Sequence, residues 1–170
     1  SIVGKRHGAR DERANLLDDY TRIIQELTPS VFLLENVPNL ASIDDGRILD
    51  RIQKRLRNAG YGVKCEIVRA ADFGVPQMRK RLVMLGILGA STIEFPKPSH
   101  GGSLHPYVTA REAIGDLPDA GEFGEVGVPN HEPTAHSAQM LARFKRLPPG
   151  KRERLSFHDR LHPDKLAYTL

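Results

Sequence analysis

The sequence predicts an α/β fold, and three features of its first half predict it. Apolar residues recur at helical spacing over residues 12–27, and a short continuous apolar run follows at 31–34. A second helical pattern then runs from Ser42 towards Gly60. Two β-like runs follow it, at 61–69 and 82–88. Helical and strand patterns that alternate along a chain are typical of a sheet with helices packed against it.

The first helix and strand have clear boundaries. Asp11 is a candidate N-cap of the helix, and Pro29 ends it. The apolar run at 31–34 predicts a strand that is buried on both faces. Six residues form the helical repeat: Leu16, Leu17, Tyr20, Ile23, Ile24 and Leu27.

The second helix begins with a capping signal. Ser42 and Asp45 have the spacing of a capping box, with Asp in place of Glu, and Gly60 suits the C-terminus. A strand, a helix and a next strand predict a parallel crossover. The last two strands are joined by a loop without a helix, so we expect an antiparallel pair at the end of the sheet.

The composition changes after about residue 95, where prolines and glycines mark a linker. We therefore divide the chain into two domains, 1–95 and 96–170. In the second, Thr109 and Glu112 predict a capping box that opens a short helix. We expect a loop over 118–133 and a further helix from Ser137 to about residue 146.

Composition excludes several classes of protein. The chain has 170 residues, 39% of them hydrophobic and 27% charged, which is typical of a globular domain. No apolar run is long enough for a transmembrane helix, so we expect no membrane association. A net charge of +4 is equally compatible with a nucleic-acid partner and with an ordinary basic surface. The single cysteine, Cys65, excludes an internal disulfide and fits a reducing cytoplasm; its alternating context indicates a core residue.

Glu35 is the first candidate for chemistry. It follows a buried strand, and in open α/β sheets ligands bind beyond the carboxyl ends of strands. We expect its carboxyl group to be partly desolvated, which suits it to donate a proton or a hydrogen bond. The alternative is a strand-end glutamate that caps the next loop.

Gln77, Arg79 and Arg81 are the second candidate. In an extended segment, alternate side chains share a face, so these three would point together. Two guanidinium groups on one face make a clamp for an anion or a carbonyl oxygen. The alternative is a solvated basic edge that protects a strand from aggregation.

Two other groups of residues are weaker candidates. The histidines at 131 and 136 resemble a zinc motif, but the spacing is one residue too long and Pro133 interrupts it, so we predict no metal site. A basic cluster surrounds a Pro-Pro-Gly sequence and would either contact phosphates or face solvent. It consists of Lys145, Arg146, Lys151, Arg152 and Arg154.

Taken in order, these segments resemble the C5-cytosine DNA methyltransferase family. Glu35-Asn36-Val37 matches the Glu-Asn-Val motif of that family, and Gln77-Met78-Arg79-Lys80-Arg81 matches its Gln-x-Arg-x-Arg motif. Residues 70–76 are similar to the segment before the second motif. Residues 107–114 resemble the entry to the target-recognition region, and residues 160–165 with Thr169 resemble its exit.

The resemblance implies a fold and a reaction. Residues 1–95 would be the second half of a Rossmann-like, S-adenosylmethionine-dependent methyltransferase sheet, and 96–170 a linker and part of a small target-recognition region. In the family a thiolate attacks C6 of a cytosine flipped out of double-stranded DNA, and C5 takes a methyl group from S-adenosylmethionine. A tRNA cytosine-5 methyltransferase, a non-catalytic nucleic-acid-binding remnant and an unrelated basic domain are the alternatives.

The resemblance also implies roles for individual residues. Glu35 contacts N3 and the exocyclic amine of the cytosine, which makes attack at C6 easier. Arg81 binds the base carbonyl, and Arg79 orders the loop or the backbone. Asn36 shapes the strand end and, like Gln77, is a candidate substrate-binding residue. Leu16 aligns with a position that borders the cofactor.

The chain departs from the family pattern in ways that predict an internal fragment. The family's nucleophile lies in Pro-Cys-Gln-x-x-Ser, and Ser1 resembles its last serine. The glycine-rich cofactor motif and the last two family motifs have no counterpart in the sequence. We expect no methyl transfer by this chain alone. For a prokaryotic member, we expect a cytoplasmic or nucleoid-associated protein with a possible restriction endonuclease counterpart.

Overall fold

The computed structural model describes residues 12–118, 129, 131 and 134–169. Contacts between residues divide the chain into two compact units. The first comprises Ser1–Arg69 and Lys80–Pro98, and the second Ala70–Arg79 and Ser99–Leu170. The loop between the last two strands thus groups with the second unit.

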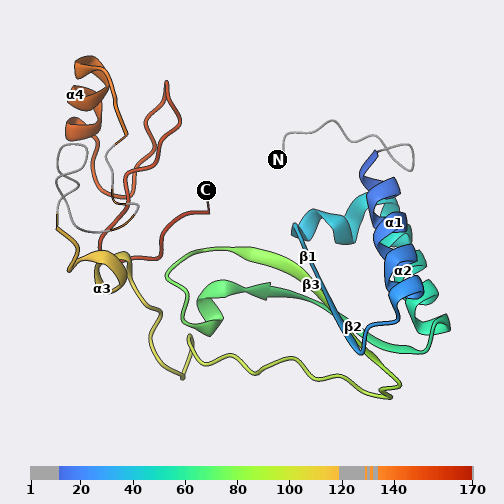
Figure 1. Cartoon of the computed structure of the whole chain (residues 1–170). Coiled ribbons are helices and arrows are strands. Elements are labelled where there is room, and N and C mark those ends of the chain that lie inside the picture. The colour runs from blue at the N-terminus through green and yellow to red at the C-terminus, as the bar shows by residue number, and fades with distance from the viewer. Residues whose placement is uncertain (1–11, 119–128, 130, 132–133, 170) are drawn as a thin grey trace. The chain divides into compact units, whose positions relative to one another are not determined.

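The first unit contains a three-stranded sheet (Figure 1). Its strands are β1 (Val31–Asn36), β2 (Tyr61–Arg69) and β3 (Lys80–Leu88), in the order β1-β3-β2. Both outer strands pair antiparallel to β3, so β1 and β2 run in the same direction without being neighbours. The antiparallel pairing of β2 with β3 is confirmed, and in the described residues this pair lies at one end of the sheet, with β3 next to β1.

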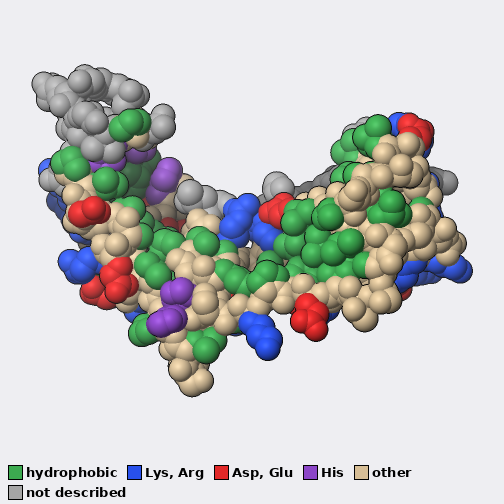
Figure 2. Space-filling model, turned by 60° about the horizontal axis from the view of Figure 1, so that its bottom comes forward, with side chains coloured by type: hydrophobic (Ala, Val, Ile, Leu, Met, Phe, Trp, Pro, Cys, Tyr) green, Lys and Arg blue, Asp and Glu red, His purple; other side chains and the backbone are tan. Residues whose placement is uncertain are grey.

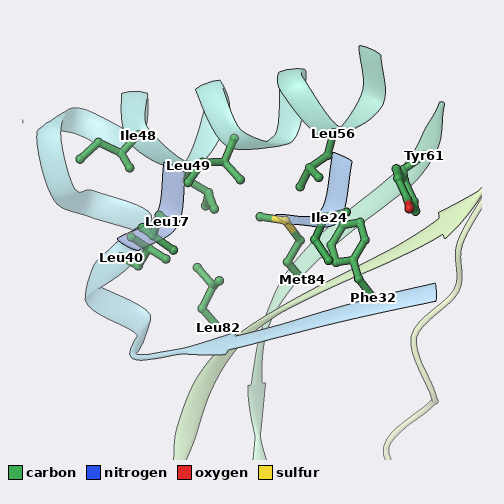
Figure 3. Packing of buried hydrophobic residues seen from close by; sticks show 11 residues of the cluster. Leu17, Ile24, Phe32, Leu40, Ile48, Leu49, Leu56, Tyr61, Leu82 and Met84 are labelled. Atoms are coloured by element: carbon green, nitrogen blue, oxygen red, sulfur yellow. The ribbon is translucent and has the colours of Figure 1, made fainter. Parts of the chain in front are cut away.

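Helices pack on one face of this sheet and enclose the core (Figure 3). They are α1 (Glu12–Leu27), the 3-10 segment η1 (Pro38–Gly46) and α2 (Arg47–Asn58). The bounds of α1 confirm the helical spacing, while the proposed N-cap Asp11 lies outside the described residues. The core cluster comprises Leu17, Ile24, Phe32, Leu40, Ile48, Leu49, Ile52, Leu56, Tyr61, Leu82 and Met84.

Strand β1 is buried on one face only. Phe32 is 4% exposed, whereas Val31 and Leu33 are 54% and 60% exposed. The prediction of burial on both faces is therefore wrong, because within the described residues the helices cover only the face that carries Phe32. Hydrophobic side chains consequently gather on the open surface of this unit (Figure 2).

The start of α2 also differs from the prediction. Asp44 and Asp45 adopt left-handed conformations, with φ of 52° and 53°, and the N-cap is Gly46, which makes no side-chain capping bond. The hydroxyl of Ser42 donates instead to the carbonyl of Asn39, at 3.0 Å. The predicted capping box is wrong, although Gly60, with φ of 91°, follows the helix end as expected.

Cys65 packs against the core of the first unit, as its alternating context predicted. Burial, and secondarily the charge of Glu66, raises the pKa of its thiol. Because the thiolate is the reactive form, we expect the thiol to react with a disulfide reagent more slowly in the native chain than in the unfolded chain at pH 8. Equal rates in the presence and absence of denaturant would contradict this placement of Cys65.

The second unit contains short elements (Figure 1). These are η2 (Ala70–Phe73), α3 (Ala110–Ile114) and α4 (Ala138–Arg146). The predicted capping box opens α3: the Thr109 N–H donates to the Glu112 carboxylate at 2.7 Å, which lowers the pKa of Glu112. Ser137 caps α4. Most of the expected loop at 118–133 lies outside the described residues. Among the residues that the structure describes, no helix is long and apolar enough to span a membrane.

Candidate functional site

Glu35 and Arg81 meet on one face of the sheet in the first unit. Glu35 lies opposite Val83 in the β1–β3 register, so Arg81, two residues before Val83, shares its face. The Arg81 Nε atom lies 2.6 Å from Oε1 of Glu35. The pair stands near the carboxyl end of β1, where the sequence placed a ligand site.

The two partners differ in exposure. The Arg81 side chain is 19% exposed, and its Nη1 atom donates to the carbonyl of Lys80 at 2.8 Å. Two bonds therefore hold its guanidinium plane in place. The Glu35 side chain is 47% exposed, so the desolvation expected from a strand buried on both faces is not found.

A second carboxylate provides an internal comparison for Glu35. Glu66 of β2 pairs with Val83 across the β2–β3 register, as Glu35 does across the β1–β3 register. The two glutamates therefore flank Val83 on the same face of the sheet. It forms an ion pair with Lys64, at 2.9 Å, and its side chain is 41% exposed. Glu35 and Glu66 thus differ mainly in their cationic partner and in their strand.

Asn36 turns the chain out of β1. Its Oδ1 atom accepts a hydrogen bond from the N–H of Val37 at 2.8 Å. Val37 then leads into η1, which begins with Pro38. This contact agrees with the expected role of Asn36 in shaping the strand end, and its contact with substrate stays a prediction.

Gln77 and Arg79 belong to the second unit. The Gln77 N–H donates to the carbonyl of Val75 at 2.7 Å, and the Arg79 N–H donates to that of Gln77 at 2.8 Å. Such bonds between residues two apart make tight three-residue turns. β3 begins only at Lys80, so of the three residues only Arg81 lies in a strand, and the shared face of Gln77, Arg79 and Arg81 stays a prediction.

Leu16, the candidate cofactor neighbour, lies on the exposed side of α1. Its side chain is 67% exposed, whereas the adjacent Leu17 is 7% exposed and belongs to the core. An exposed leucine offers apolar contact to a ligand but no hydrogen bond. The cofactor role of Leu16 stays a prediction.

The basic cluster of the second unit adjoins a cavity. Arg152 forms an ion pair with Asp159, at 2.6 Å, and this hydrogen bond lowers the pKa of the Asp159 carboxyl. The rings of His136, Phe144 and His158 pack against one another, and the ring centroids of Phe144 and His158 lie 5.4 Å apart. A cavity of about 350 Å³ is lined by Phe144, Leu147, His158, Asp159, Arg160 and Leu161.

Among the described residues, no group of three or more potential ligands could hold a metal ion.

Comparison with known proteins identifies the family of this chain. The sequence model of C-5 cytosine-specific DNA methylases matches residues 1–165. The chain belongs to this family.

Relatives agree with that assignment. Type II methyltransferase M1.HphI of Haemophilus parahaemolyticus is 37% identical over 146 residues, which cover 85% of this chain and 38% of that protein. Type II methyltransferase M.BbvI of Brevibacillus brevis is 31% identical over 192 residues, which cover all of this chain and 49% of that protein. This C-5 cytosine-specific DNA methylase chain therefore spans less than half of the length of either relative.

A solved structure shows the fold. A protein described as a DNA modification methyltransferase encoded within an E. coli prophage superposes with a TM-score of 0.73. The match covers 94% of this chain and 58% of that one, at 21% sequence identity. The chain therefore has a partial methyltransferase fold of mixed α/β type.

Sequence reasoning named Tyr107 and Thr169 only within resembling segments and missed the contacts by which they hold the loop that carries Gln77 and Arg79. The hydroxyl of Tyr107 donates to the carboxylate of Asp72 at 2.9 Å, and the hydroxyl of Thr169 donates to the carbonyl of Met78 at 2.5 Å. The second contact joins residues 91 positions apart. Local sequence patterns carry no signal for contacts of that range.

Proposed function

We propose that this chain supplies the cytosine-binding part of a DNA (cytosine-5-)-methyltransferase, which transfers a methyl group from S-adenosylmethionine to C5 of a flipped cytosine. The observation that carries the proposal is the 2.6 Å contact between Glu35 and Arg81 near the carboxyl end of β1. The match of both residues to family motifs supports it.

The chemistry of the pair suits one edge of cytosine. The base presents its amine, N3 and its carbonyl oxygen in a row, and an enzyme reads a flipped base through hydrogen bonds to this edge. The Glu35 carboxyl group contacts the amine and N3, while the Arg81 guanidinium donates to the carbonyl oxygen. A proton held at N3 draws electron density from C6 and so favours nucleophilic attack there.

Other residues have supporting roles in this proposal. Asn36 holds the strand end, and Gln77 contacts the substrate or its backbone. Arg79 orders the loop that leads into β3. Residues 1–95 form the C-terminal half of the catalytic domain, and 96–170 form the linker and part of the target-recognition region.

The family generally uses S-adenosylmethionine, which supplies the methyl group. Among the described residues, Leu16 fits a place beside it, since its exposed side chain offers an apolar surface to a ligand. We assign no polar contact with the cofactor to this chain.

Double-stranded DNA is the proposed partner. The Type II relatives support a place in restriction and modification, with a restriction endonuclease counterpart and a cytoplasmic or nucleoid-associated location. The net charge of +4 supports binding to a polyanion, because each neutralised phosphate releases counterions.

A competition assay tests this substrate against tRNA, the alternative within the same chemistry. Labelled duplex DNA bound by the chain should be displaced by unlabelled duplex at a concentration about tenfold lower than by tRNA. Lower salt should tighten binding to both, because phosphate contacts depend on counterion release. More effective displacement by tRNA would overturn the DNA assignment, and failure of both labelled duplex and labelled tRNA to bind would contradict a nucleic-acid function for the chain.

A further inference from the structure

The C-terminal segment 163–169, which we call the strap, lies against the loop that carries Gln77 and Arg79. The N–H of Ala167 donates to the carbonyl of Pro76 at 2.9 Å, and the N–H of Met78 donates to the carbonyl of Ala167 at 2.8 Å. These two bonds form a parallel bridge between Gln77 and Ala167. The hydroxyl of Thr169 adds a third bond, to the carbonyl of Met78.

The other end of the strap is fastened to the start of α3. The N–H groups of Ala110 and Arg111 donate to the carbonyls of Lys165 and Pro163, at 2.9 and 2.8 Å. The Arg111 Nε atom lies 2.8 Å from the Asp164 carboxylate, and this bond lowers the pKa of Asp164. Since the first N–H groups of a helix have no partner within it, the strap satisfies bonds that α3 leaves open.

The loop is held at its beginning as well. The carbonyl of Asp72 accepts hydrogen bonds from the N–H groups of Ser99 and His100, at 2.9 and 3.0 Å. The N–H of Ala70 donates to the carbonyl of Arg79 at 2.8 Å and closes the loop. Hydrogen bonds thus hold the loop at both of its ends. The strap contacts the two tight turns within the loop, through Pro76 and Met78.

We propose that Thr169 is a positioning residue for methyl transfer: through its bond to Met78, it fixes the backbone of the loop from which Gln77 and Arg79 project. The inference rests on the proposed function, because the loop matters for catalysis only if Gln77 contacts the substrate and Arg79 orders the loop, as proposed above. Thr169 acts through Met78 and contacts no reacting atom in this scheme. Its side chain is exposed, so we expect the unit to fold after its replacement.

Hydrogen exchange tests the strap in the chain itself. Thr169→Val keeps the branched shape and removes the hydroxyl, and loss of one hydrogen bond should speed exchange in peptides that cover 74–79 by about fivefold. Thr169→Ser should restore slow exchange, and Thr92→Val, at an exposed threonine of the first unit, should change nothing. Peptides from α4 serve as the internal reference in every variant. Unchanged exchange at 74–79 in Thr169→Val would overturn the strap.

Turnover tests the positioning role in the longer protein that carries this chain. Thr169→Val should lower kcat for methyl transfer about three- to tenfold, with the KM for S-adenosylmethionine unchanged and with full rescue by Thr169→Ser. Faster exchange with unchanged kcat would overturn the positioning role. If the wild-type protein transfers no methyl group, both the proposed function and the positioning role are wrong. The hydrogen-exchange result would still decide whether the strap holds the loop.

Discussion

Glu35→Gln lowers kcat/KM for methyl transfer by about 10²- to 10⁴-fold in the protein that carries this chain, since a positioned acid contributes that much to catalysis. Glutamine keeps the shape of the side chain and can still accept or donate a hydrogen bond, but it cannot hold a titrating proton at N3. It also removes the charge that orients Arg81, whose Nε lies 2.6 Å from the carboxylate. The assay is transfer of labelled methyl groups to duplex DNA at several substrate concentrations.

Glu66→Gln is the matched control. Glu66 occupies the same rung and face of the sheet and loses a comparable ion pair, with Lys64. We expect kcat/KM to stay within about twofold of the wild type, because exposed ion pairs contribute little to stability and Glu66 has no part in the proposed site. Equal losses in the two variants would show that the sheet tolerates neither change and that Glu35 has no special role.

Gly86→Ala destabilises the first unit by about 1–3 kcal/mol, the usual range for inserting a methyl group into a packed core. A Cβ at Gly86 would lie 1.9 Å from a ring carbon of Phe32, its cross-strand neighbour. The ring has little room to move, because it packs edge-on against Tyr61 and Tyr20, with centroid distances of 5.1 and 6.3 Å. Urea unfolding followed by circular dichroism measures the change.

Phe32→Leu provides the test of mechanism. The smaller side chain loses core contacts and lowers the free energy of unfolding by itself, but it vacates the space that the new methyl group needs. Gly86→Ala should therefore cost less in the Phe32→Leu background than in the wild type, and the difference is the coupling between the two sites. Equal costs in both backgrounds would show that the destabilisation comes from a backbone effect and not from a clash with Phe32.

Features that depend on neighbouring residues were predictable from the sequence. The bounds of α1 follow from the spacing of its apolar residues. The capping box of Thr109 and Glu112 follows from side chains that bond within three residues, and the helix expected from Ser137 is found as α4. The motif around Glu35 indicated the end of β1, where Glu35 contacts Arg81.

Features that depend on distant residues were not predictable in the same way. β3 lies between β1 and β2, a neighbour order that local patterns do not carry. The exposure of Leu33 arises separately, because within the described residues the helices cover only the face that carries Phe32. The left-handed residues before α2 replace the capping signal at Ser42. The contact of Glu35 with Arg81 requires the β1–β3 register, and that of Thr169 with Met78 joins segments far apart in the chain.

Identification of the methylated product tests the central claim most directly. The protein that carries this chain is incubated with labelled S-adenosylmethionine, duplex DNA and tRNA, and both nucleic acids are digested to nucleosides. The account predicts that the label is in 5-methylcytosine from the DNA and that it falls sharply with Glu35→Gln but not with Glu66→Gln. Label in another nucleoside, or only in tRNA, would contradict the assignment of this chain to cytosine binding in a DNA methyltransferase.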